Sequence, residues 1–314
     1  MHVALAGGVG AARFLRGLVR AVPPGEVTAV VNVGDDLDRH GLHVSPDLDS
    51  IAYWLAGVIH PEQQWGRADE SFVVASELER FGEGRWFSLG DRDLATHIYR
   101  TKRLREGAPL SAVTAEIVRA FGLDVTLLPA TDDAVATRVT TGDGRDLHFQ
   151  EYWVGERAAP VVTGVRLAGA EAASPAPGVL EAVTGASSLL LCPSNPVVSI
   201  GTILAVPGIR EAVAASPAPV VGVSPIVGGK VVRGMADKLL PAVGAEVSAL
   251  GVARLYADLL DGWIVDERDA ALAPAIADEL GIEVVVTDTM MDDVGVATEL
   301  ARTAVSLCRG DEAA

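Results

Sequence analysis

The chain has 314 residues, of which 49% are hydrophobic, so it can bury a substantial core and is not expected to be disordered. Its formal net charge of −17 disfavours nucleic acid and anionic membranes as partners. The two cysteines, Cys192 and Cys308, are too few for a disulfide framework, and no apolar run resembles a signal peptide or a membrane span, so a cytoplasmic protein is expected.

The start of the chain predicts alternating strands and helices. Residues 2–6 form an apolar run that predicts a buried strand, and Gly7-Gly8-Val9-Gly10 follows it directly. A helix is expected from about residue 11, and residues 28–33 predict a second strand. A further helix is expected to begin around residue 49.

Residues 60–159 have a different character and predict an insertion beside the sheet. The turn residues Gly142-Asp143-Gly144-Arg145 separate two strand-like segments, which is typical of a β-hairpin. The expected helices of this insertion cover residues 72–81, 93–104 and 111–121, and its hairpin strands cover residues 136–141 and 146–153.

The second half of the chain returns to the alternating pattern. Strands that alternate with helices predict right-handed crossovers and a mostly parallel sheet flanked by helices. We therefore predict an α/β core made of residues 1–59 and 160–314, with the mainly helical insertion of residues 60–159 carrying a β-hairpin. The expected strands of the second half cover residues 188–192, 219–223, 263–265 and 282–286, and its last helix covers residues 294–307.

Three loops that follow predicted strands carry residues suited to a ligand. Gly7, Gly8 and Gly10 open a helix, so their backbone can approach a phosphate at a helix N-terminus. A tight turn without a ligand explains the same glycines equally well. Together the three loops predict a nucleotide or phosphate site, to which the other two contribute Asn195, Gly228 and Gly229.

Four aspartates cluster after the second predicted strand. Asp35, Asp36, Asp47 and Asp49 are expected in one loop at the carboxyl edge of the sheet, where open α/β folds bind ligands. Turn formation and capping of the next helix are alternative reasons for these residues. Carboxylates at that edge would repel an anionic substrate unless a cation intervened, and Mg²⁺ binds through one or two carboxylates together with substrate phosphates.

Basic residues are the remaining candidates for ligand contacts. Arg92 stands at the start of a predicted helix, where it is either a surface residue or a fixed donor to an acidic ligand. Lys230, Arg233 and Lys238 could add positive charge near the last glycine loop. No histidine has the spacing of a catalytic triad or of a metal site, so hydrolysis through a covalent intermediate is not supported.

Several blocks of this sequence together resemble the CofD/FbiA family. They follow the family's order from the first predicted strand to about Lys238. The blocks are residues 7–13 (GGVGAAR), 32–36 (NVGDD), 46–49 (PDLD), 89–97 (LGDRDLATH), 149–153 (FQEYW), 193–201 (PSNPVVSIG) and 224–226 (SPI).

The resemblance implies a Rossmann-like core, a homodimer, dependence on Mg²⁺ and a role in coenzyme F(420) biosynthesis. It implies transfer of a phosphoenolpyruvyl or 2-phospholactyl group from a guanosine-diphosphate conjugate to the deazaflavin 7,8-didemethyl-8-hydroxy-5-deazariboflavin, with release of GMP. Residues 229–237 (GKVVRGMAD) resemble the actinobacterial branch of the family, which favours phosphoenolpyruvate as the transferred group.

The resemblance and the residue chemistry together lead to a hypothesis for the site. Family contacts to the deazaflavin fall on an Asp and an Arg that match Asp49 and Arg92. Asp35 and Asp36 are expected to hold Mg²⁺ and Asp49 to orient the acceptor hydroxyl, so these three are the catalytic candidates. The glycine loops and Asn195 are expected to position the nucleotide.

Two other classes of protein share parts of this pattern. An NAD-dependent oxidoreductase also has a glycine turn after the first strand and an acidic residue after the second. The long acidic loop after Gly34-Asp35-Asp36 argues against it. A YvcK-like regulatory protein that binds nucleotide sugars without turnover is the second alternative, but it would not need the blocks around Asp49 and Arg92.

Overall fold

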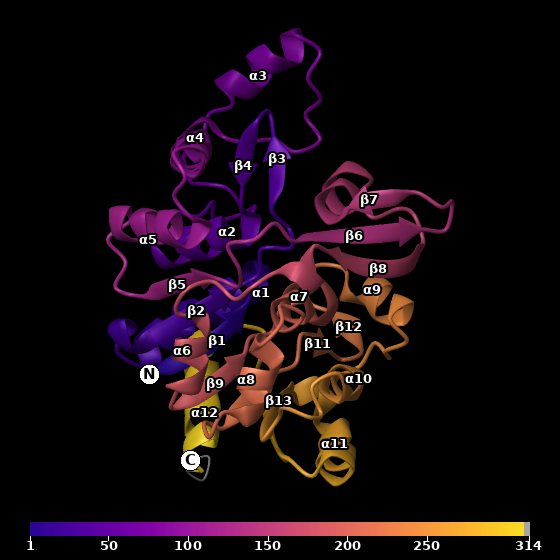
Figure 1. The fold of residues 1–314 in the computed structure, drawn as a ribbon. Helices are drawn as coiled ribbons and strands as arrows, with labels where there is room; N and C mark the ends of the chain where they lie inside the picture. Colours follow the sequence, from indigo (N-terminus) through magenta and orange to yellow (C-terminus); the bar gives the residue numbers. More distant parts are fainter. Residues whose placement is uncertain (311–314) are drawn as a thin grey trace.

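The centre of the protein is a sheet of seven parallel strands (Figure 1). In the computed structural model, which describes residues 1–310, they lie in the order β14-β13-β10-β9-β1-β2-β5. Every neighbouring pair is parallel, which confirms the predicted α/β sheet. The strands are β1 (His2–Ala6), β2 (Val27–Val31), β5 (Thr126–Pro129), β9 (Ser188–Leu191), β10 (Val220–Val223), β13 (Gly262–Asp266) and β14 (Glu283–Thr287).

Burial on both faces explains why the central strands read as continuous apolar runs rather than as alternating ones. All residues of β1, β2, β9, β10 and β13 are buried. Valine dominates β2 and β10, and its branched side chain packs well on a pleated surface. Strand β14 is partly exposed because it lies at an edge of the sheet.

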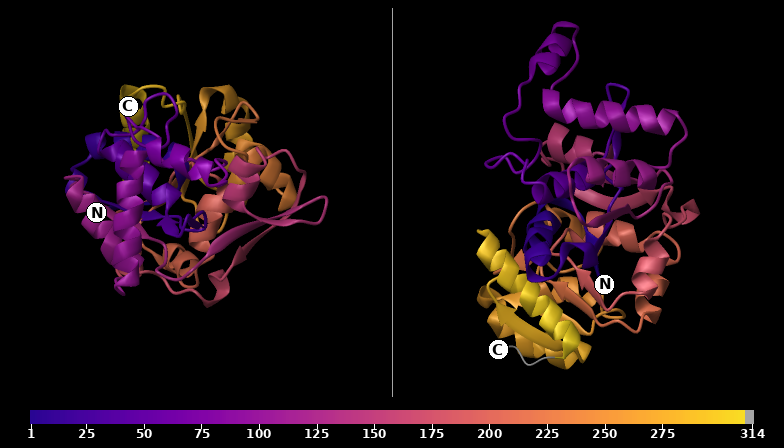
Figure 2. Two further views of the ribbon diagram at one scale, coloured as in Figure 1. Left: turned by 90° about the horizontal axis from the view of Figure 1, so that it is seen from above. Right: turned by 90° about the vertical axis from the view of Figure 1, so that its left-hand side faces the viewer.

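Helices flank this sheet, and α12 lies alongside α1 although the two come from opposite ends of the chain (Figures 1 and 2). Gly17 permits their close approach, because an added Cβ there would lie 2.1 Å from the carbonyl oxygen of Ala297. The core helices are α1 (Gly8–Ala21), α2 (Pro46–Leu55), α6 (Val179–Thr184), α7 (Gly201–Leu204), α8 (Ile209–Ala215), α9 (Ala236–Ala242), α10 (Ala249–Arg254), α11 (Ala273–Leu280) and α12 (Val294–Arg309).

Within residues 1–310, no single helix has both the length and the apolarity needed to cross a bilayer. One pair of segments, Pro196–Leu204 and Ile209–Ala215, meets that test only jointly and is bent by 81°. Ile203 and Val213 of this pair are buried in the core of the protein.

The chain reverses its direction of travel across the sheet between β1 and β9. From β1 it proceeds to β2 and β5 on one side, and it then returns to place β9, β10, β13 and β14 on the other. The loops after β1 and β9 therefore diverge and open a crevice at the carboxyl ends of the strands. Open α/β sheets bind ligands in such a crevice.

The region predicted as an insertion also contributes to the main sheet. Strand β5 lies within residues 60–159 yet pairs with β2, and β8 lies beyond this range yet pairs with β6. The predicted helices and hairpin are present, but the second hairpin strand, expected over residues 146–153, ends at His148, and residues 149–155 are helical. The division into two domains stays a prediction. The other helices and strands of this region are α3 (Val73–Arg80), α4 (Asp91–Arg105), α5 (Leu110–Ala120), β6 (Ala136–Thr141) and β7 (Asp146–His148). Together with β8 (Val162–Ala168), β6 and β7 form an antiparallel sheet in the order β7-β6-β8.

The expectation that the four aspartates lie in one loop is wrong. A hairpin of β3 (Leu37–Arg39) and β4 (Leu42–Val44) separates them, and α2 begins at Pro46. Asp47 and Asp49 therefore belong to the first turn of α2. The hairpin turns at His40 and Gly41, both with positive φ, and histidine is a less usual choice there than Asn or Gly.

Candidate functional site

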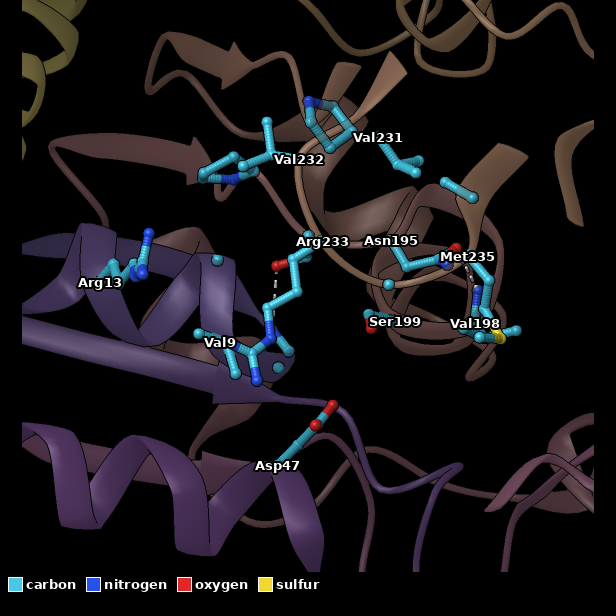
Figure 3. A pocket seen from close by; sticks show the side chains of 18 of the residues that line it. Val9, Arg13, Asp47, Asn195, Val198, Ser199, Val231, Val232, Arg233 and Met235 are labelled. Carbon is cyan, nitrogen blue, oxygen red and sulfur yellow. Dashed lines mark hydrogen bonds between the residues drawn. The ribbon is translucent and has the colours of Figure 1, made fainter. Parts of the chain in front are cut away.

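A hollow at the carboxyl ends of β1 and β9 is the candidate site (Figure 3). It encloses about 950 Å³, its open mouth included. Its walls come from the loops after β1, β2, β9, β10 and β14 and from the start of α2. The segment between β12 (Lys230–Val231) and α9 also contributes. Phe149 and Trp153 form an apolar side, with ring centroids 5.6 Å apart. The hollow thus occupies the crevice that the strand order creates.

The first glycine loop lies at this hollow, as predicted. Gly7, Gly8 and Gly10 all line it, and α1 begins at Gly8. An added Cβ at Gly10 would lie 2.2 Å from the carbonyl oxygen of Pro193, so the first turn of α1 packs closely against the residue that begins the loop after β9. Close packing therefore requires a glycine at this position. The same arrangement directs the N-terminus of a long helix at the hollow, which suits a phosphate.

Asn195 lines the hollow, whereas Gly228 and Gly229 do not contribute to its lining. The Asn195 Oδ1 accepts hydrogen bonds from the N–H groups of Val197 and Val198, so only its side-chain NH₂ remains to donate to a ligand. Gly228 and Gly229 form the turn between β11 (Ile226–Val227) and β12, with φ of 58° and 71°. That turn explains both glycines without a phosphate.

Asp35 and Asp47 are the two carboxylates that line the hollow. The Asn32 Nδ2 donates to Asp47 Oδ2 at 2.9 Å, and the Gln150 Nε2 donates to Asp35 Oδ2 at 3.1 Å. Burial raises the pKa of Asp35 well above its ordinary value, and the neighbouring Asp47 raises it further. Oδ1 of Asp35 is buried without a hydrogen-bond partner. The hydrogen-bond donors to these two carboxylates are therefore neutral amides, and no positive charge among residues 1–310 compensates the pair.

Asp36 does not line this hollow, although it follows Asp35 directly. Its Oδ2 accepts from Ser45 Oγ at 2.7 Å and lies 3.0 Å from His43 Nε2. Burial raises the pKa of Asp36, and His43 and Ser45 oppose this shift. Oδ1 of Asp36 is also buried without a hydrogen-bond partner, so one oxygen of each adjacent aspartate is unpaired.

Asp49 is paired inside the protein rather than facing the hollow. Both of its oxygens accept from the guanidinium group of Arg100, including a bond of 3.0 Å from Nη1 to Oδ2. Each side chain of this pair is almost fully buried. His97 lies beside the pair, with Nε2 3.2 Å from Asp93 Oδ2. The sequence offered no sign of Arg100, because it stands among four other basic residues on α4.

Arg92 is exposed and lies outside the lining of the hollow. Its backbone N–H donates to Glu70 Oε2 at 2.7 Å, which ties down the start of α4. The arginines that do line the hollow are Arg13 and Arg233. Figure 3 shows Arg233 reaching into the hollow, with Asp47 on the opposite wall. Arg13 follows the glycine loop by one helical turn. This spacing is the sequence signal that could have identified Arg13 as a residue of the site.

Replacing Asp47 with asparagine is expected to stabilise the protein at neutral pH. Burial raises the pKa of Asp47 from 3.8 to about 6, so the folded state binds more protons than the unfolded state between these values. Stability from this group therefore falls as the pH rises through that window. We expect Asp47→Asn to raise the free energy of unfolding by roughly 2 kcal/mol at pH 7.5 and to change it little near pH 3.5. Urea titrations at both pH values measure this, and an equal effect at the two would contradict it.

The side chains at this site suit a metal ion that a bound ligand also coordinates. They suit a metal ion coordinated by the protein alone less well. Within residues 1–310, no three His, Cys, Asp or Glu side chains come together in an arrangement that could hold a metal ion. Mg²⁺ commonly binds through one or two carboxylates, with water and substrate phosphates completing its shell. The unpaired Oδ1 atoms of Asp35 and Asp36 suit this kind of site.

A parallel sheet with a glycine loop, carboxylates and arginines at its switch point is typical of α/β enzymes that bind phosphate-bearing ligands. Comparison with known proteins narrows this class. The family model described as 2-phospho-L-lactate transferase CofD matches residues 3–304. The chain is 54% identical over 311 residues to the phosphoenolpyruvate transferase of Kitasatospora aureofaciens, with 97% of each chain covered. It is 42% identical over 323 residues to that of Mycolicibacterium smegmatis, with 96% of this chain and 97% of the relative covered.

The chain therefore belongs to the CofD family. It is a transferase, and its reaction is a phosphoryl transfer in coenzyme F(420) biosynthesis. Membership of this family excludes the alternative that the chain is an NAD-dependent oxidoreductase. A crystal structure of a UPF0052 family member from Bacillus halodurans is similar with a TM-score of 0.67, covering 97% of this chain and 98% of that one. At 17% identity this similarity shows the fold alone.

Proposed function

We propose that the chain transfers a phosphoenolpyruvyl group from a guanosine-diphosphate conjugate to the deazaflavin 7,8-didemethyl-8-hydroxy-5-deazariboflavin and releases GMP. The names of the relatives support phosphoenolpyruvate over 2-phospholactate as the transferred group. The observation that carries the proposal is the composition of the hollow. It joins a glycine loop and two arginines, which suit a diphosphate, to an apolar aromatic side, which suits a planar ring.

The hollow offers each substrate a different wall. The backbone of the glycine loop and the start of α1 would hold the diphosphate, with the side-chain NH₂ of Asn195 as a further donor. Phe149, Trp153 and Met235 would pack against the deazaflavin ring. Both substrates would then meet at the carboxyl edge of β1, beside Asp35 and Asp47.

The reaction needs the acceptor hydroxyl in line with the phosphorus that carries the transferred group. The hydroxyl oxygen forms the new P–O bond, and the diphosphate P–O bond breaks so that GMP leaves with the bridging oxygen. Asp47 would orient the hydroxyl and accept its proton, because its pKa of about 6 is close to neutrality. This assigns to Asp47 the role that the sequence had suggested for Asp49.

Mg²⁺ is proposed as the cofactor, with Asp35 as a ligand from the hollow and Asp36 as the second candidate. Burial raises the pKa of both, and a cation would offset this cost. When bound there with the diphosphate oxygens, the ion would neutralise charge on the reacting phosphates. The buried Oδ1 atoms of Asp35 and Asp36 have no hydrogen-bond partner that an ion would have to displace.

Three further expectations stay predictions. The deazaflavin contacts expected at Asp49 and Arg92 would need a rearrangement or a second binding surface, because neither residue lines the hollow. A cytoplasmic location is expected from the composition. A homodimer is expected from the family, and the exposed side chains of Val73 and Phe81 on or beside α3 are apolar surface that a second copy could cover.

The test is turnover with defined substrates. Purified protein, Mg²⁺ and the deazaflavin would be mixed with either the phosphoenolpyruvyl or the phospholactyl conjugate of guanosine diphosphate, and GMP and the phosphodiester product would be measured. We expect faster turnover of the phosphoenolpyruvyl conjugate. Tight binding of a nucleotide sugar with no turnover of either conjugate would instead support the YvcK-like regulatory alternative.

A further inference from the structure

Two guanidinium groups meet at the mouth of the hollow and share one neutral acceptor. The Arg13 Nη2 donates to Gln64 Oε1 at 2.9 Å, and the Arg233 Nη1 donates to the same oxygen. The Arg233 Nη2 also donates to the carbonyl oxygen of Gln63 at 2.8 Å. Within residues 1–310, neither arginine forms an ion pair with a carboxylate, although the chain has 42 acidic residues.

This arrangement leaves positive charge uncompensated. Burial lowers the pKa of Arg233, and the nearby charge of Arg13 lowers it further. A neutral amide oxygen offsets two guanidinium charges only weakly, whereas a carboxylate or phosphate could accept several charge-assisted hydrogen bonds from them. An anion at the position of Gln64 Oε1 would therefore compensate the charge of both arginines.

Gln64 is held in place by an unusual backbone conformation. Its φ is +62°, in the left-handed region that residues other than glycine seldom adopt. The Gln64 N–H donates to the carbonyl oxygen of His60, and the His60 N–H donates to that of Gly66, which closes the turn. An isolated bridge between Ile59 and Arg67 anchors it to the chain. Strain of this kind is concentrated at binding and switch sites.

We propose that Arg13 and Arg233 form an anion clamp that binds an oxyanion of the donor, and that Gln64 Oε1 occupies the place of a ligand oxygen until the donor binds. This inference rests on the proposed function, because the donor is what supplies the oxyanion. The donor carries two such groups, its diphosphate and the carboxylate of the transferred group. Both present the oxygen pair that a guanidinium group recognises.

The near-isosteric variant Gln64→Glu tests the clamp directly. A glutamate at this position would place a permanent carboxylate between the two arginines, so it would compete with the ligand. We expect the Kd for GDP or phosphoenolpyruvate, measured by calorimetry with Mg²⁺, to rise by at least about 10-fold in Gln64→Glu. Gln64→Ala removes the placeholder without adding charge, so its Kd is expected to be no higher than that of the unmodified protein.

The arginine variants identify which oxyanion the clamp binds. Arg13→Met and Arg233→Met are each expected to weaken one of the two probes by at least about 10-fold. Loss of GDP affinity would assign the clamp to the diphosphate, and loss of phosphoenolpyruvate affinity alone would assign it to the transferred group. Arg16→Met is the matched control, because Arg16 lies one turn further along α1, stacks over Trp54 at 5.6 Å and does not line the hollow.

The outcomes separate this inference from the proposed function. The clamp would be overturned if Gln64→Glu bound both probes with unchanged affinity and its melting temperature showed that the variant is folded. This conclusion would not depend on the rate of turnover. If the variants weaken binding as expected but no deazaflavin product forms with any conjugate, the clamp stands and the proposed transfer fails. A higher melting temperature of Gln64→Glu without ligand is also expected, because the new carboxylate pairs with two arginines.

Discussion

Asp35→Asn is expected to lower kcat by about 100- to 1,000-fold, the range seen when one preorganised electrostatic contact at a reacting centre is removed. Asp35 lines the hollow, and its Oδ1 is buried without a partner. An asparagine would keep the shape and the bond from Gln150 but would lose the charge that a cation needs. Initial rates of GMP release, measured over a range of Mg²⁺ concentrations, check this prediction.

A matched control separates the loss of charge at the site from a general effect of the substitution. Asp124 is exposed and lies outside the lining of the hollow, so Asp124→Asn should keep the rate of the unmodified protein. The dependence of the Asp35→Asn rate on Mg²⁺ should also shift to higher concentrations. A rate within a few-fold of the unmodified protein, with the same dependence on Mg²⁺, would remove Asp35 from the proposed site.

Arg100→Met should lower the free energy of unfolding by about 3–5 kcal/mol, because it strands the buried carboxylate of Asp49 without its counter-charge. Arg100 and Asp49 are both almost fully buried, and the pair joins α4 to the first turn of α2. Tyr53 strengthens this junction by donating to Asp93 at 2.7 Å. Urea unfolding at pH 7.5 measures the loss.

The same helix supplies the control for this experiment. Arg103 pairs with Glu116 at the surface, with 30% of its side chain exposed, so Arg103→Met should cost only about 0–1 kcal/mol. Combining Arg100→Met with Asp49→Asn removes the stranded charge and should recover part of the loss. If Arg100→Met cost no more than Arg103→Met, the buried pair would not be a major support of α2.

The parallel sheet could be predicted from the sequence because its signals are local. Strands buried on both faces, such as β1 and β2, read as continuous apolar runs, and the glycines after β1 mark the turn into α1. The β3–β4 hairpin was missed because His40 is an uncommon turn residue. Strand β5 was assigned to the insertion because nothing in its own sequence shows that it pairs with β2.

What the sequence by itself determined is the fold class, the glycine loop and the acidic character of the carboxyl edge. Only the tertiary structure decided which of those acids face the hollow. Asp47 and Asp49 are two residues apart on α2, so their side chains point about 160° apart around the helix axis, one to the hollow and the other to Arg100. Arg13, Gln64 and Arg233 come from three distant segments and meet only because the strand order brings those segments to one crevice. Periodicity and composition describe neighbours along the chain, and these contacts depend on neighbours in space.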